Sequence, residues 1–314
     1  MRHTVIPLLM ILAIATIPVQ ADGVLGDGPR DAWWYLEYQV GLGPRNPGSQ
    51  GHRALTQFLQ TELGEYADRV LVQDFSIVHN GKTIPMRNVA GLFLPTTAAT
   101  GAVAPANALA NAPAPYVIIG AHFDTRPIAD WDPDPAKQST PIIGANDGGS
   151  GVAILLELAG ILAKRRPPFP VMLAFFDGED FGTTSSSMFL GSKQFAAAVD
   201  PSDVKCMILL DMVGDADLKL HMEGYSANRY PALSAAIWDG AAAIGYGSTF
   251  PKSVKHYILD DHIPFLERGI PAVDIIDFDY PYWHTTSDTI DKCSPESLSM
   301  VRDVVLEAIF GGRL

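Results

Sequence analysis

Five short segments of this chain place a carboxylate or an imidazole at the end of an apolar run or just after it. They are Gly120-Ala-His122-Phe-Asp124, Gly144-Ala-Asn-Asp147, Phe176-Asp-Gly-Glu179-Asp180, Leu210-Asp211 and Trp283-His284-Thr285. In a parallel α/β sheet the carboxyl ends of the strands meet at one edge, and functional side chains gather in the crevice beyond that edge. We therefore expect these five segments to lie together at one edge of a sheet.

The rest of the chain alternates the patterns of strands and helices. Strands are expected at Val70–Ile77, Asn88–Leu94, Tyr116–Ala121, Val171–Phe176, Cys206–Leu210 and Ala272–Ile276. Helices are expected at 31–40, 51–63, 151–164, 193–199, 231–244, 263–268 and 295–310. Residues 95–115, rich in Ala, Pro, Thr and Asn, predict a surface loop. The fold class is therefore α/β, a single domain with a mostly parallel twisted sheet and helices on both faces.

Composition and charge narrow the possible partners. The chain has 314 residues, of which 47% are hydrophobic, so it can bury a sizeable core. Its formal net charge of −13 argues against nucleic acid as a partner, because binding to phosphates requires a basic face.

The first 21 residues predict a signal peptide. Arg2 and His3 precede an apolar run over 5–17, and Val19-Gln-Ala21 offers small residues for cleavage. The run is short for a bilayer span, so an uncleaved anchor is the less favoured alternative. We expect residues 22–314 to be the catalytic domain, exported to the periplasm or secreted, with no stable membrane span after cleavage. Export permits a disulfide, but sequence does not decide whether Cys206 and Cys293 pair.

Three of the candidate residues suit a metal ion. Asp147 lies in a glycine-rich turn that opens a helix, and Asp180 belongs to an adjacent pair of acids, which a bound cation would stabilise. With His284 they give three ligands without cysteine, a set suited to zinc with one open catalytic position. The alternatives are that Asp147 caps the following helix and that His284 is structural.

One further acid, Glu179, suits proton transfer, and two more acids, Asp211 and Asp260, follow strands, where they could also be turn acids or helix caps. Glu179 lies beside a proposed ligand, so burial and its neighbour would raise its pKa and fit it for general acid–base work. Asp260 and Asp261 in particular could cap the helix expected at 263–268.

These residues match a known family. The chain resembles the zinc aminopeptidase superfamily and, within it, the glutaminyl-peptide cyclotransferases (glutaminyl cyclases), over nearly all of the mature chain. The matching segments are Gly43-Pro-Arg-Asn-Pro-Gly-Ser-Gln-Gly-His52, His122-Phe-Asp124, Asn146-Asp147, Phe175-Phe-Asp-Gly-Glu179-Asp180, Leu210-Asp211, Asp260-Asp-His-Ile-Pro-Phe265 and Trp283-His284-Thr285. Two features favour the cyclases: the segment Asp260–Phe265, and the presence of Trp283 directly before the last histidine of the chain, His284.

The resemblance implies a role for each residue. Asp147, Asp180 and His284 resemble the ligands of a single zinc ion, and Glu179 matches the general acid/base. Asp211 and Asp260 match an acidic pair that hydrogen-bonds near Glu179. Trp283 matches an aromatic wall of the substrate pocket. His122 corresponds to a ligand of a second metal that the aminopeptidases bind and that cyclases generally lack.

The chain departs from the cyclases in three places. Cyclases usually carry Glu at the position of Asp180, although aminopeptidases accept either residue. Residues 181–190 lack the Trp that animal enzymes place after the paired acids, and Leu259 replaces a polar side chain found in some relatives.

The favoured function is zinc-dependent cyclisation of the N-terminal glutamine of peptides or proteins to pyroglutamate, with release of ammonia and one zinc ion per chain. The alternative is a two-zinc aminopeptidase, in which His122 and Asp211 bind the second metal. A binding module without activity is a third class, but such a protein should have lost residues from the cluster, and none is missing.

Overall fold

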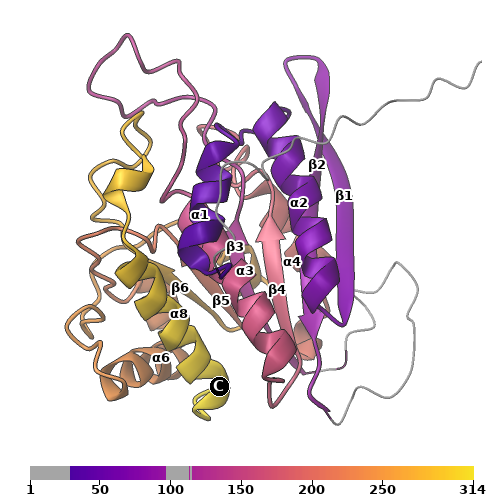
Figure 1. Cartoon of the computed structure of the whole chain (residues 1–314), viewed down its shortest axis with the longest axis vertical. Helices are drawn as coiled ribbons and strands as arrows, with labels where there is room; N and C mark the ends of the chain where they lie inside the picture. Colours follow the sequence, from indigo (N-terminus) through magenta and orange to yellow (C-terminus); the bar gives the residue numbers. More distant parts are fainter. Residues whose placement is uncertain (1–28, 97–112, 114) are drawn as a thin grey trace, which may run out of the picture.

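The computed structural model describes residues 29–96, 113 and 115–314, so the predicted signal peptide and most of the predicted 95–115 loop lie outside the described residues. A single six-stranded sheet with the order β1-β2-β4-β3-β5-β6 runs through this part of the chain (Figure 1). The strands are β1 (Arg69–His79), β2 (Lys82–Phe93), β3 (Tyr116–His122), β4 (Val171–Phe176), β5 (Val204–Asp211) and β6 (Ala272–Ile276).

The strands β4, β3, β5 and β6 form a parallel block. β1 and β2 form an antiparallel hairpin, and β2 joins the block antiparallel to β4. All six predicted strands exist, and the mostly parallel α/β fold is confirmed. The hairpin strands are longer than predicted because their outer halves carry exposed polar side chains, which broke the apolar pattern.

Eight α-helices lie in the described residues. They are α1 (Ala32–Gly41), α2 (Gln50–Tyr66), α3 (Gly149–Lys164), α4 (Leu190–Ala198), α5 (Gly224–Arg229), α6 (Pro231–Ala243), α7 (Ile263–Glu267) and α8 (Pro295–Phe310). All seven predicted helices are found, whereas the short α5 was not predicted. None of the described helices combines the length and the apolar composition needed to cross a membrane.

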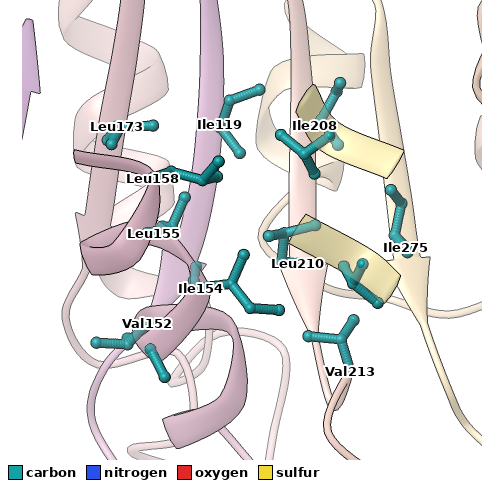
Figure 2. Packing of buried hydrophobic residues seen from close by; sticks show 14 of the residues in the cluster. Ile119, Val152, Ile154, Leu155, Leu158, Leu173, Ile208, Leu210, Val213 and Ile275 are labelled. Atoms are coloured by element: carbon teal, nitrogen blue, oxygen red, sulfur yellow. The ribbon is translucent and has the colours of Figure 1, made fainter. Parts of the chain in front are cut away.

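The helices cover both faces of the sheet because its buried strands alternate their side chains between two cores. Ile119, Leu173 and Ile208 face one core, which α1, α2, α3, α6 and α8 complete. Figure 1 shows α1, α2, α3 and α8 over this face, and Figure 2 shows Ile154, Leu155 and Leu158 of α3 against the strand residues. The residues that alternate with these along the strands, such as Ile118 and Met207, face a second core with α4 and α7.

The helix starts decide two of the alternatives left open by the sequence. Asp31 and Ser49 cap α1 and α2, each accepting a hydrogen bond from a backbone N–H of the first turn. In contrast, α3 begins after Gly148 and α7 after His262, and neither helix has a side-chain cap. The capping interpretation of Asp147 and of Asp260 and Asp261 is therefore wrong, and these carboxylates are available for other partners.

Cys206 and Cys293 are both free and buried, so they do not pair.

The chain order brings the candidate residues to one edge. From β3 the chain crosses to β4 on one side through α3, and then from β4 to β5 on the other side of β3 through α4. The loops after β3, β4 and β5 therefore leave the sheet next to one another, at the point where a doubly wound sheet places its functional groups. His122 is the last residue of β3 and Asp211 is the last residue of β5.

Candidate metal centre

The three residues proposed from sequence to hold a metal ion lie together. Asp147, Asp180 and His284 are buried, and each offers one ligand atom, with these atoms all within 4.8 Å of one another. His284 Nε2 lies 3.1 Å from Asp180 Oδ1 and 3.5 Å from Asp147 Oδ2. The three side chains come from loops after three different strands. They meet because those strands are parallel and share one edge.

His122 belongs to a second group around the same Asp147. His122, Asp147 and Asp211 also offer ligand atoms within 4.8 Å of one another. His122 Nε2 lies 3.2 Å from Asp147 Oδ1 and 3.1 Å from Asp211 Oδ1. Asp147 therefore presents one carboxylate oxygen to each imidazole, which is the geometry of a ligand placed between two cation positions.

The donor atoms of the first group fit a divalent cation. Asp147 Oδ2 and Asp180 Oδ2 are buried and have no hydrogen-bond partner, which is costly for carboxylate oxygens unless something binds them. Imidazole nitrogen and carboxylate oxygen without cysteine are typical of a catalytic zinc site with an open position. Asp147, Asp180 and His284 would hold such an ion.

Electrostatics point the same way. Burial and the charge of Asp180 raise the pKa of Asp147 to about 7. Burial alone would raise the pKa of Asp180 as well, but His284 and Arg126 hold it below the ordinary value. The centre therefore gathers more negative charge than its own side chains neutralise, and a cation would favour the ionised form of Asp147.

Glu179 lies next to these ligands without belonging to either group. Its Oε2 lies 3.9 Å from His122 Nδ1, and only 6% of the residue is exposed. Burial first, and then the negative charges of Asp180, Asp260 and Asp261, raise the pKa of Glu179 well above its ordinary value. A carboxyl group in such a place can hold a proton near neutral pH and exchange it.

Asp211 and Asp260 are both buried near Glu179, but no hydrogen bond joins either of them to Glu179. Asp211 instead faces His122. Asp260 Oδ1 accepts from the backbone N–H of Asp261, and its Oδ2 has no partner. Burial and the charge of Asp211 raise the pKa of Asp260 well above its ordinary value. The acidic pair is therefore present, while the hydrogen bonding expected near Glu179 is not made in this structure.

Behind Asp260 lies a buried group that was not expected from the sequence. His262 Nε2 lies 3.2 Å from Glu223 Oε2, and His262 Nδ1 lies 3.6 Å from Asp274 Oδ2. All of these side chains are buried. The sequence carried one signal for this group, since Asp274 interrupts the otherwise apolar β6.

Two aspartates fix the backbone of the ligand loops. Asp124 accepts hydrogen bonds from the backbone N–H groups of Glu179 and Asp180, at 3.0 and 3.3 Å. Asp288 does the same for Asn146 and Asp147, at 2.9 and 3.1 Å. Each aspartate accepts from two backbone N–H groups of a turn that lies outside the strands and helices. It therefore orients the candidate metal ligand on that turn, Asp180 or Asp147.

Arg126 and Asp130 support Asp180 and His284. The Arg126 guanidinium donates from Nη1 to Asp180 Oδ1 at 3.1 Å, and from Nε and Nη2 to the two oxygens of Asp130 at 2.7 and 2.8 Å. Asp130 Oδ1 in turn lies 3.6 Å from His284 Nδ1. A carboxylate behind a ligating imidazole is a common way of orienting it. Arg126 and Asp130 lie only four residues apart, but the sequence did not indicate their role because Asp180 and His284 lie in other loops.

Trp283, which the sequence predicts to form an aromatic wall of the substrate pocket, lies beside His284. Its ring stacks on the His284 imidazole with centroids 3.8 Å apart and an interplanar angle of 24°. Trp131 from the loop after β3, and Phe278 from the same loop as Trp283, contact the Trp283 ring with centroids at 5.2 and 5.1 Å.

Comparisons with known proteins agree with this geometry. The model of peptidase family M28 matches residues 105–309. The glutaminyl cyclase of Bacteroides thetaiotaomicron, solved with N-acetylhistamine, is 32% identical with a TM-score of 0.80, covering 89% of this chain and 96% of that chain. A Zn-dependent exopeptidase from Parabacteroides distasonis is 33% identical with a TM-score of 0.81, covering 89% of this chain and 97% of that chain.

Curated proteins give the same pair of activities at lower identity. The glutaminyl-peptide cyclotransferase of Bos taurus is 26% identical over 230 residues, which is 61% of this chain and 62% of that protein. The chain spans between 40% and 68% of the length of the first three curated relatives that it matches. The resemblance to the glutaminyl cyclases within the zinc aminopeptidase superfamily is confirmed, and the neighbours support a metal cofactor.

Proposed function

The chain belongs to peptidase family M28, and on that premise we propose that it is an exported glutaminyl-peptide cyclotransferase. Its substrate would be a peptide or protein with an N-terminal glutamine, and its products a pyroglutamyl peptide and ammonia. Export through residues 1–21 is part of the proposal, and it rests on the sequence pattern of a signal peptide.

We propose one zinc ion per chain, held by Asp147, Asp180 and His284. When bound, zinc supplies Lewis acidity that polarises a carbonyl oxygen. The free carboxylate oxygens of Asp147 and Asp180 support this choice. The other imidazole, His122, then contacts Asp147 and Asp211 as a neighbour of the centre and not as a ligand.

The residues of this chain supply the proton transfer. In the proposed reaction the neutral α-amine of glutamine attacks its own γ-carboxamide carbon, so a carbon–nitrogen bond forms within one residue at high effective concentration. Glu179 accepts the proton that the amine loses, and returns it to the leaving nitrogen, which departs as ammonia. Glu179 is almost fully buried, and burial together with the charge of Asp180 raises its pKa, which fits it to hold and release a proton near neutral pH.

One observation carries the choice of cyclisation over hydrolysis. Trp283 stacks on the His284 imidazole, and Asp260 is buried with one carboxylate oxygen free of hydrogen bonds, whereas a solved glutaminyl cyclase and a leucine aminopeptidase precursor match the chain equally well. The segments that carry Asp260 and Trp283 are those by which the sequence leans toward the cyclases.

A second candidate function rests on the group of His122, Asp147 and Asp211. This group is complete, and it shares Asp147 with the first group. A two-zinc aminopeptidase would use both groups, with Glu179 as the base for the attacking water. A leucine aminopeptidase precursor from Bacteroides thetaiotaomicron is also similar, at 32% identity.

The two functions give different products from the same substrate. The purified protein would be incubated with the dipeptide Gln-Ala and, separately, with leucine p-nitroanilide. Release of ammonia and pyroglutamyl-alanine, without free alanine, supports the cyclase. Release of free glutamine and alanine, or of nitroaniline, would instead assign the aminopeptidase. The Glu179→Gln variant is the control for a contaminating activity, because it should lose either reaction.

A further inference from the structure

Trp131 is a large apolar side chain that the fold leaves in solvent. It is 63% exposed, the most exposed aromatic side chain in the described part of the chain. Single exposed apolar residues are common on protein surfaces and need no explanation by themselves. Trp131 differs because it lies beside the candidate metal centre and its backbone is fixed there.

Hydrogen bonds hold the loop of Trp131 against the loop of His284. The backbone N–H of Trp131 donates to the carbonyl oxygen of His284 at 3.2 Å. On one side Asp130 is bound by Arg126, and on the other Asp132 Oδ2 accepts from the backbone N–H of Thr286 at 2.9 Å. The exposed indole is therefore carried by a backbone that is already fixed. Binding a ligand group to it costs less conformational entropy than ordering a free loop would.

The indole continues an aromatic surface that starts at a candidate ligand. The His284 imidazole stacks on Trp283 at 3.8 Å, and Trp283 meets Trp131 at 5.2 Å with an interplanar angle of 45°. Consecutive Cα atoms of a peptide are 3.8 Å apart. The second residue of a substrate whose first residue reacts at the centre is therefore close enough to reach this pair of indoles if the peptide leaves the centre past Trp283.

The neighbouring charges do not compete for this surface. The guanidinium of Arg126 neutralises Asp130, and Asp132 is engaged by Thr286. The two indoles present aromatic faces, and such faces bind flat or bulky apolar groups best.

We propose that Trp131 and Trp283 form the subsite for the second residue of the peptide substrate, and that this subsite favours an aromatic or large aliphatic side chain. The proposal rests on the proposed function for the position of the first residue. Trp131 acts as a specificity-determining residue that contacts the substrate side chain and takes no part in proton transfer.

The test compares two peptides, Gln-Phe-Ala-amide and Gln-Gly-Ala-amide, in three variants. Trp131→Ala should lower kcat/KM for the Phe peptide by about 3- to 10-fold through KM, and leave the Gly peptide unchanged. Trp131→Phe should restore most of the loss. Ile244→Ala removes another exposed apolar side chain, at the end of α6, and should change neither peptide.

Binding separates this proposal from the proposed function. Calorimetric titration of the wild type and Trp131→Ala with pyroglutamyl-Phe-Ala-amide and pyroglutamyl-Gly-Ala-amide reads the subsite without turnover. Tighter binding of the Phe peptide that is lost in Trp131→Ala supports the subsite. Equal binding of both peptides, or a preference that survives in Trp131→Ala, overturns it. Absence of ammonia release together with a Trp131-dependent Phe preference would refute the cyclase and retain the subsite.

Discussion

Replacing His122 by Ala separates the one-zinc centre from a two-zinc centre. Its imidazole is buried and reaches Asp147 and Asp211 through the same Nε2 atom. In a one-zinc cyclase the ring packs beside the centre, so its loss should weaken the fold and leave one zinc ion per chain. In a two-zinc aminopeptidase the ring binds the second metal directly, so its loss should halve the zinc content.

The size of the effect on stability follows from the contacts. The residue is fully buried, so Ala leaves a cavity of imidazole size and removes the hydrogen-bond donor of Asp211. A buried polar group without its partner costs about 1–3 kcal/mol, and the cavity adds to this cost, for a total of roughly 2–4 kcal/mol. At about 2–4 °C for each kcal/mol, the midpoint of thermal unfolding should fall by roughly 4–16 °C.

The assay is elemental analysis of dialysed protein beside thermal unfolding and ammonia release. His284→Ala is the matched control, because it removes the other imidazole that faces Asp147 and should lose the ion in both cases. We expect one zinc per chain in the wild type and in His122→Ala, and almost none in His284→Ala. Two tightly bound zinc ions in the wild type, one of them lost with His122, would refute the one-zinc centre and favour the peptidase.

Three further substitutions test individual roles. Glu179→Gln should keep its zinc and its unfolding midpoint but lose about 10²- to 10⁴-fold in kcat, since an amide cannot carry the proton; near-normal kcat would show that another group does so. Asp180→Ala should lose zinc and activity together, and a zinc content equal to the wild type would remove Asp180 from the ligand set. Arg126→Met should weaken zinc affinity by about 10- to 100-fold in chelator competition, because Arg126 orients Asp180 and Asp130; unchanged affinity would make Arg126 merely structural.

The sequence predicted the sheet and its active edge because both depend on local patterns. A short apolar run such as Val171–Phe176, bounded by turn residues, is typical of a buried strand, and parallel strands bring their carboxyl ends together. His122, Asp180 and Asp211 could therefore be placed at one edge from their positions after strands. That argument needs no knowledge of side-chain contacts.

Contacts between loops were beyond the same reasoning. Arg126 reaches Asp180 across more than fifty residues, and Asp288 reaches the backbone of Asp147 across more than a hundred. No periodicity or spacing encodes such pairs, so Arg126, Asp130 and Asp288 had no visible role in the sequence. Trp131 was missed for the same reason, because its importance comes from the neighbouring Trp283 and not from its own segment.

The hydrogen bonds of Asp288 have a consequence for the order in which the protein matures. Asp288 holds the turn of Asp147, and His284 faces the same Asp147, so both supports come from the last part of the chain. A growing chain that has not yet reached this part contains Asp147 and Asp180. It lacks His284, the third candidate ligand, and Asp288, which holds the turn of Asp147. Closing so long a loop is slow relative to local folding. Selective metal uptake should therefore be a late event of biogenesis, after the segment beyond β6 has docked.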